Sequence, residues 1–148
     1  LPLKEPEVQG ALSPQEVIQK HGETEKGVVR ILLAEDEPMI QKILSMILNQ
    51  RGHQIETVAN GQEAVDRWHE GAYDLILMDM QMPEMDGIEA ACKIRRLEKE
   101  NGMNQVPIIA LSADVRTETR EKCQAAGMDG FLSKPINFEA LYDVVENT

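Results

Sequence analysis

Polar side chains follow or end four separate apolar runs of this 148-residue chain, where buried strands would break into loops. Glu35 and Asp36 follow the first run, and Asp79 closes a later one. Ser112 and Lys134 come after two more. Because carboxylates are rare at the end of a buried strand unless they are paired or functional, we expect these groups to form one polar site.

The acidic groups of this set suit a divalent cation. Carboxylates a few ångströms apart raise each other's pKa, and a cation between them removes that cost. Mg²⁺ is favoured, since it takes one or two carboxylates and leaves its other positions to water and phosphate oxygens. No His or Cys accompanies Glu35, Asp36 and Asp79, which disfavours zinc.

The remaining two groups suit a phosphoryl group beside that metal. Lys134 supplies a positive point charge and Ser112 supplies a hydroxyl donor. The chemistry predicted from the whole set is therefore the transfer of a phosphoryl group onto a carboxylate, with Asp79 as the nucleophile.

The elements that must position these groups follow a regular rhythm from residue 28 onward. Short apolar runs alternate five times with amphipathic stretches of helical period, which is typical of parallel strands joined by crossover helices. We predict strands at 28–34, 54–58, 74–78, 106–111 and 130–132. We predict helices at 38–50, 62–70, 87–100, 115–126 and 138–146, with Asn60 and Asn137 as N-caps.

The predicted fold class is α/β, a flavodoxin-like doubly wound sheet of five parallel strands in the order 2-1-3-4-5 with five helices. In such a sheet a ligand binds outside the carboxyl ends of the strands, where the strand order changes direction. The first, third and fourth strands are neighbours, and the fifth lies just beyond. The polar groups can therefore converge on one shallow pocket.

The length and composition indicate one substantial core, since 42% of the 148 residues are hydrophobic. We expect residues 28–148 to form the domain that holds the site. Residues 1–27 are polar, and we predict a linker or N-terminal extension with a short helix that begins near Ser13.

The charge and the apolar runs exclude several function classes. A net charge of −11 and a pI near 4.7 argue against nucleic acid binding. No apolar stretch approaches the ~20 residues that span a bilayer, and no signal peptide is visible. Cys92 and Cys123 form no close pair in the sequence. We therefore expect a cytoplasmic, reducing location, with neither nucleic acid nor membrane bound by this chain.

Four longer stretches contain the polar groups. They read ILLAEDEP at 31–38, LMDMQMPEMDG at 77–87, PIIALSA at 107–113 and GMDGFLSKP at 127–135. Taken together, these stretches resemble the receiver domains of bacterial-type two-component response regulators, over roughly residues 29–147. A phosphorelay role and a bacterial source are expected on the same ground.

The resemblance implies a role for each member of the predicted metal and phosphoryl site. Asp79 looks like the phosphoacceptor, and Lys134 like the lysine that pairs with phosphate. Glu35, Asp36 and Asp79 would hold Mg²⁺ together with the backbone carbonyl of Gln81. The peptide bond between Lys134 and the proline that follows is expected to be cis.

The resemblance also implies a switch. Phosphorylation adds roughly 1.5 to 2 negative charges, which would draw the hydroxyl of Ser112 and the amine of Lys134 inward. Phe131, which resembles the rotating aromatic residue of the family, would then fill the space that Ser112 leaves. Phe131 stands where Tyr is commoner, so it lacks the hydroxyl for an outward hydrogen bond. Gln81 and Asp114 match positions that tune the lifetime of the phosphoryl group.

The expected partner is a histidine kinase or a histidine phosphotransfer domain, which docks near the first predicted helix in similar systems. That helix has an inward apolar stripe formed by Ile40, Ile43, Leu44, Ile47 and Leu48. Met39 and Met46 fall on its edge, where methionine suits an adaptable contact or completes the core. A weak homodimer is left open.

The sequence begins without Met and ends soon after its last apolar stripe. We therefore expect a piece of a hybrid sensor histidine kinase, with a stand-alone response regulator as the alternative.

Other interpretations of the same residues must be weighed. Taken singly, the acidic pair could favour a helix N-terminus, Asp79 could form a turn, Ser112 could be an N-cap, and Lys134 could be solvated.

Other function classes would need residues that this chain lacks. A phosphatase with an Asp nucleophile would want a second Asp two residues on, where this chain has Gln81. A nucleotide-binding or flavin-binding module would want a Gly-rich loop after the first strand. A degenerate receiver that only binds partners would not need the complete set of acidic, hydroxyl and lysine side chains, so the presence of that set argues against it. We expect a phosphoacceptor that catalyses only its own phosphorylation and dephosphorylation.

The aromatic and imidazole side chains receive ordinary structural interpretations. His21, His53 and His69 are isolated in the sequence, and we expect them at the surface. Trp68 shares a helical face with apolar residues, which indicates that it packs in the core.

Overall fold

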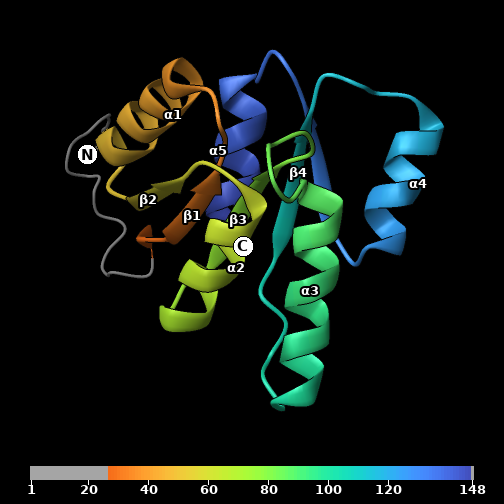
Figure 1. The fold of residues 1–148 in the computed structure, drawn as a ribbon. Coiled ribbons are helices and arrows are strands. Elements are labelled where there is room, and N and C mark those ends of the chain that lie inside the picture. Colours follow the sequence, from red (N-terminus) through yellow and green to blue (C-terminus); the bar gives the residue numbers. More distant parts are fainter. Residues whose placement is uncertain (1–26, 148) are drawn as a thin grey trace, which may run out of the picture.

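The computed structural model describes residues 27–147, so the helix predicted near Ser13 and the surface position predicted for His21 lie outside the described residues. Figure 1 shows helices on both faces of one twisted sheet. In chain order the elements are β1 (Arg30–Ala34), α1 (Pro38–Gln50), β2 (Gln54–Val58), α2 (Gly61–Glu70), β3 (Leu75–Asp79), α3 (Gly87–Glu100), β4 (Ile108–Ser112), α4 (Thr117–Ala125), β5 (Gly130–Ser133) and α5 (Phe138–Glu146). Among these helices none is both long enough and apolar enough to cross a bilayer.

The strands form one parallel sheet in the order β2-β1-β3-β4-β5. This order confirms the predicted fold, and no element boundary differs from its prediction by more than two residues. One such difference has a clear cause. The strand β4 begins two residues late, since the backbone N–H of Val106 donates to the buried carboxylate of Glu98, at 2.7 Å, instead of entering the sheet.

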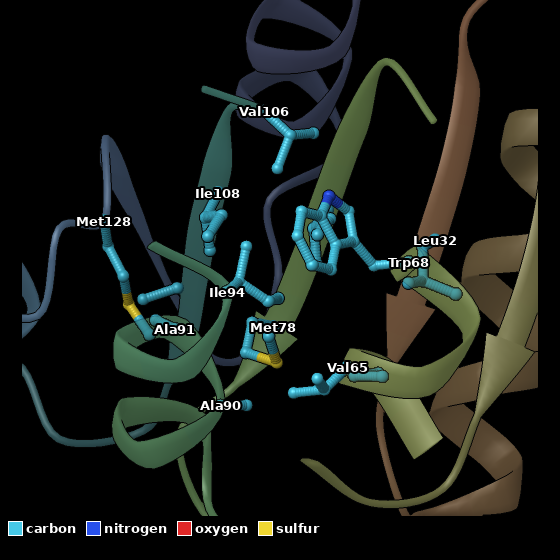
Figure 2. Packing of buried hydrophobic residues seen from close by; sticks show 14 of the residues in the cluster. Leu32, Val65, Trp68, Met78, Ala90, Ala91, Ile94, Val106, Ile108 and Met128 are labelled. Atoms are coloured by element: carbon cyan, nitrogen blue, oxygen red, sulfur yellow. The ribbon is translucent and has the colours of Figure 1, made fainter. Parts of the chain in front are cut away.

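Successive residues of the central strands point to opposite faces, and each face has its own core. On one face Leu32, Ile76 and Ile108 pack under α2, α3 and α4. In Figure 2 the ring of Trp68, from α2, and the side chain of Ile94, from α3, both extend over the sheet. Trp68 is only 4% exposed, which confirms its predicted place in the core.

The opposite face is covered by α1 and α5. Leu44 and Leu48 of α1 and Leu141 of α5 are buried against it. The prediction that Ile43 points inward is wrong, because Ile43 is 37% exposed. The buried stripe of α1 is narrower than the sequence suggested, and Ile43 lies at its margin about 100° around the helix from Leu44.

The prediction that His53 lies at the surface is also wrong, because His53 is buried. Its Nδ1 accepts a hydrogen bond from the N–H of Val29 at 3.1 Å, so the proton is assigned to Nε2, which faces Glu146 Oε2 at 3.1 Å. Arg51 binds Glu146 through two nitrogens at 2.6 Å and lies over the ring of Tyr142. This cluster ties the start of β1 to the end of α5. His69 is exposed, as predicted.

Glu146→Gln should lower the free energy of unfolding by about 1 kcal/mol at neutral pH, since the neutral amide loses the charged pair with Arg51. The hydrogen bonds from Arg51 lower the pKa of Glu146, against the smaller opposing effect of burial. The stabilisation is therefore fully present above the ordinary value of 4.5 and is lost as the pH falls through the lower value of the folded state.

Urea unfolding of both proteins at neutral pH and near pH 3 checks this expectation. The exposed Glu70→Gln is the control and should match wild type at both pH values. A difference between wild type and Glu146→Gln that persists undiminished in acid would contradict the assignment.

Candidate functional site

The predicted polar residues lie together at the carboxyl ends of the strands. Glu35 and Asp36 follow β1, Asp79 is the last residue of β3, Ser112 is the last residue of β4, and Lys134 follows β5. All five line one open cleft, together with parts of the loops after β1, β3 and β4. The sheet order thus brings side chains from four strand ends to one place.

The three carboxylates of the cleft lie close to one another. One oxygen from each of Glu35, Asp36 and Asp79 falls within 4.8 Å of the others. Glu35 and Asp79 are buried, whereas Asp36 is exposed. Burial raises the pKa of Glu35 to about 7, and the negative charge of Asp79 adds to the rise against the opposing effect of Lys134.

Lys134 provides the positive charge among these carboxylates. Its Nζ lies 3.0 Å from Glu35 Oε1 and 3.2 Å from Asp79 Oδ1. Burial by itself would lower the pKa of Lys134, but the close contacts with the negative charges of Glu35 and Asp79 outweigh it, so the pKa is raised. Lys134 is therefore held in its charged form beside the oxygens of Asp79.

The donor set fits a hard divalent cation. Glu35 Oε1 is buried and, although it is ion-paired with Lys134, it has no hydrogen bond of good geometry. A buried carboxylate oxygen without a well-formed hydrogen bond is stabilised by a further positively charged partner. The available ligands are carboxylate oxygens, which Mg²⁺ prefers. Gln81 lines the same cleft, and its N–H approaches Asp79 Oδ1 at 3.4 Å.

Ser112 lines the cleft, but its hydroxyl is bonded to the loop that follows β4. The N–H of Asp114 donates to Ser112 Oγ at 3.0 Å, and Ser112 Oγ lies 3.1 Å from the carbonyl of Asp114. The carboxylate of Asp114 accepts from Thr119 Oγ1 at 2.8 Å and pairs with Arg116 at 2.8 Å. A chain of hydrogen bonds therefore connects the Ser112 hydroxyl to the first turn of α4.

Phe131 lies on β5, outside the residues that line the cleft in the described part of the chain. Its ring is partly buried and packs against the core on the side of α4. The guanidinium carbon of Arg120, from α4, lies 4.6 Å from the ring centroid. A cation–π contact thus ties Phe131 to α4; a tyrosine would keep the ring and add a hydroxyl.

Two glycines that hold the loop after β3 were missed by the sequence analysis. A Cβ atom at Gly87 would overlap the carbonyl oxygen of Asp79, and one at Gly61 would overlap that of Met85. The N–H of Gly87 donates to the carbonyl of Met80 at 3.2 Å. The pair Asp86 and Gly87, an N-cap followed by a small residue, was the available signal. The peptide bond between Lys134 and Pro135 is cis, as predicted.

Comparison with known proteins identifies the family. The model of the response regulator receiver domain matches residues 31–146. The chain belongs to this family. The predicted family is thereby confirmed.

Similar proteins include both kinases and separate receiver domains. Hybrid signal transduction histidine kinase B of Dictyostelium discoideum is 45% identical over 117 residues, which are 74% of this chain and 6% of that protein. The receiver domain of Ssk1 from Saccharomyces cerevisiae, solved in complex with the histidine phosphotransfer protein Ypd1, superposes with a TM-score of 0.77 at 37% identity, over 80% of this chain and 87% of that one.

A third similar structure is the receiver domain of sensor histidine kinase PA1611 from Pseudomonas aeruginosa, with a magnesium ion in its active site cleft. Its TM-score is 0.70 at 35% identity, over 81% of this chain and 98% of that one. Similar proteins thus come from eukaryotes and bacteria, so the bacterial source expected from the sequence is not supported. The chain spans only 5% to 15% of the length of the curated relatives it matches.

Gly87→Ala should lower the free energy of unfolding by about 1 to 3 kcal/mol, because the added methyl group forces the Asp79 carbonyl and the start of α3 apart. Gly27→Ala, at a position with open space around it, is the matched control and should change stability by less than about 0.5 kcal/mol. Urea unfolding measures both variants. Equal stability of the two variants would contradict the close approach described here.

Proposed function

We propose that this receiver domain accepts a phosphoryl group on Asp79 from a phosphohistidine and changes its partner contacts when phosphorylated. The observation that carries the proposal is the geometry around Asp79. Its carboxylate lies within 4.8 Å of the oxygens of Glu35 and Asp36 and is paired with Lys134 at 3.2 Å. This arrangement gives a nucleophilic oxygen, a place for a cation and a fixed positive charge in one cleft.

The transfer is a displacement at phosphorus. A carboxylate oxygen of Asp79 attacks the phosphorus atom and forms the new P–O bond, while the P–N bond to the donor histidine breaks. The electron pair of that bond stays with the imidazole nitrogen, which takes up a proton. Lys134 pairs with the oxygens of the incoming phosphoryl group, since its ammonium group already lies beside Asp79.

The proposed cofactor is Mg²⁺, held by Glu35, Asp36, Asp79 and the backbone carbonyl of Gln81. When bound, it neutralises the charge that accumulates on the carboxylates and the phosphoryl oxygens. Glu35 Oε1, which is buried with an ion pair to Lys134 but no hydrogen bond of good geometry, supports this set. The magnesium ion in the receiver domain of PA1611 gives independent support.

The proposed response to phosphorylation starts at Ser112. A phosphoryl oxygen on Asp79 competes with Asp114 for the Ser112 hydroxyl. Release of that bond frees the loop that Asp114 joins to Thr119, and with it the first turn of α4. Phe131, which contacts Arg120 on α4, is placed to respond to the same shift. The switch therefore biases two arrangements of α4 and β5.

We also propose the context of the domain. Residues 28–148 form the receiver and residues 1–27 a linker or extension, within a hybrid sensor histidine kinase acting in the cytoplasm. The kinship with Dictyostelium hybrid kinases supports this context. A stand-alone response regulator is the alternative. In either case the domain turns over no outside substrate.

The proposed partner surface is the outer face of α1. Met39, Ile43 and Met46 are 66%, 37% and 49% exposed, and their spacing places them side by side on the helix. Together they form an apolar stripe beside the cleft, since α1 begins at its edge with Pro38. A histidine-bearing helical domain with an apolar face fits this stripe. The complex of the similar Ssk1 receiver with Ypd1 supports such a partner.

Incubation with a small-molecule phosphodonor and Mg²⁺ should add the mass of one phosphoryl group to wild type, as measured by intact mass spectrometry. Asp79→Asn should remain unlabelled, because a neutral amide oxygen is a far weaker nucleophile than a carboxylate oxygen. Asp86→Asn, which changes an exposed acid that caps α3, is the matched control and should be labelled like wild type. Labelling of Asp79→Asn at the wild-type level would reject the phosphoacceptor assignment.

Changing both Met39 and Met46 to Ser should slow phosphoryl transfer from the cognate histidine donor by about tenfold, because two exposed apolar contacts are lost. The rate with a small-molecule donor should not change. Met103→Ser alters a comparably exposed methionine elsewhere, 42% exposed, and should leave both rates unchanged. Stopped-flow or gel-based transfer assays give the rates. A wild-type transfer rate in the double variant would reject the outer face of α1 as the partner surface.

A further inference from the structure

The loop between β1 and α1 carries three consecutive acids and must be held against their repulsion. Glu35, Asp36 and Glu37 are adjacent in the chain, and like charges this close disfavour one fixed arrangement. Glu37 occupies the N-cap position of α1, but its side chain makes no capping hydrogen bond. The side-chain contact that usually fixes the start of a helix is therefore missing. Within the loop the N–H of Glu37 donates to Glu35 Oε2 at 3.2 Å, which leaves the backbone carbonyls of the loop to be held from outside it.

Gln41, in the first turn of α1, makes hydrogen bonds that hold this loop in place of the missing cap. Its backbone N–H donates to the carbonyl of Glu37 at 3.1 Å. Its side-chain Nε2 donates to the carbonyl of Glu35 and lies 3.4 Å from the carbonyl of Val58. Both ends of the acidic tripeptide are thus bound to one residue.

The same contacts tie the loop to the sheet. The N–H of Glu35 donates to the carbonyl of Val58, at the end of β2, at 3.0 Å. The amide of Gln41 approaches that carbonyl and the carbonyl of Glu35 together. Because both neighbours are acceptors, the amide nitrogen and not the oxygen must face them. The peptide that leads into Asp36 is therefore fixed from β2 and from α1.

We propose that Gln41 is a positioning residue of the metal site, which acts through the backbone of Glu35 and Asp36. This inference rests on the proposed function, since it concerns the same cation. Gln41 places the carboxylates of Glu35 and Asp36 at the spacing that a cation needs, before the cation arrives. Groups that orient ligands in this way commonly change metal affinity by 10-fold to 100-fold when they are removed.

The test compares Gln41→Met with wild type. Methionine has nearly the same length and suits a helix, but it cannot donate to the two carbonyls. Isothermal titration with Mg²⁺ in the absence of any phosphodonor should show an affinity about tenfold weaker. The matched control is Gln50→Met on the same helix, at an exposed position, which should bind Mg²⁺ like wild type.

A second readout separates positioning from general damage. With a small-molecule phosphodonor, Gln41→Met should need about tenfold more Mg²⁺ for half-maximal labelling, while its rate at saturating Mg²⁺ stays within about twofold of wild type. Gln41→Glu, which keeps the shape but loses the donors, should weaken Mg²⁺ binding as well, although it adds a negative charge. Its result stands in for Gln41→Met if the methionine variant does not fold.

The outcomes distinguish this inference from the proposed function. Wild-type Mg²⁺ affinity in Gln41→Met would overturn the role of Gln41 and leave the proposed function intact. A low labelling rate that saturating Mg²⁺ does not restore would also overturn it, since that pattern indicates damage to the reacting groups. Absence of Mg²⁺ binding by wild type itself would overturn the metal site and the inference together.

Discussion

The packing of negative charge at one edge of the sheet is the constraint on which the rest of this structure depends. Three carboxylates lie within 4.8 Å of one another, two of them buried. Lys134 stabilises two of these groups directly, yet burial still raises the pKa of Glu35 to about 7. The negative charge that Lys134 leaves unbalanced is what the proposed cation would neutralise.

The fold can hold these like charges close together because the side chains are attached at or next to the ends of buried strands. The central strands carry an apolar core on each face, which fixes where β1, β3 and β4 end. Short-range contacts then set the loops. Gly87 lets α3 approach the Asp79 carbonyl, and Gln41 binds the loop after β1. The hydrogen bonds from Ser112 through Asp114 reach the first turn of α4, the helix that the proposed switch would shift.

The sequence sufficed for the fold and for the convergence of five polar residues on one cleft, because apolar period, strand-end position and residue type are local properties. The prediction of side-chain burial failed where burial depends on residues far away in the sequence. The burial of His53 requires Glu146, 93 residues away, and the exposure of Ile43 depends on how α1 sits against the sheet. The direction of the Ser112 hydroxyl and the close approach at Gly87 are decided by backbone geometry that composition does not reveal.

The most direct test of a single cation-binding cleft is paramagnetic broadening of amide NMR signals by Mn²⁺, which accepts the same oxygen ligands as Mg²⁺. Substoichiometric Mn²⁺ should broaden first the amides next to Glu35, Asp79 and Lys134, and excess Mg²⁺ should restore them. Broadening spread over the acidic surface with no preference for these strand ends, or centred elsewhere, would contradict the account.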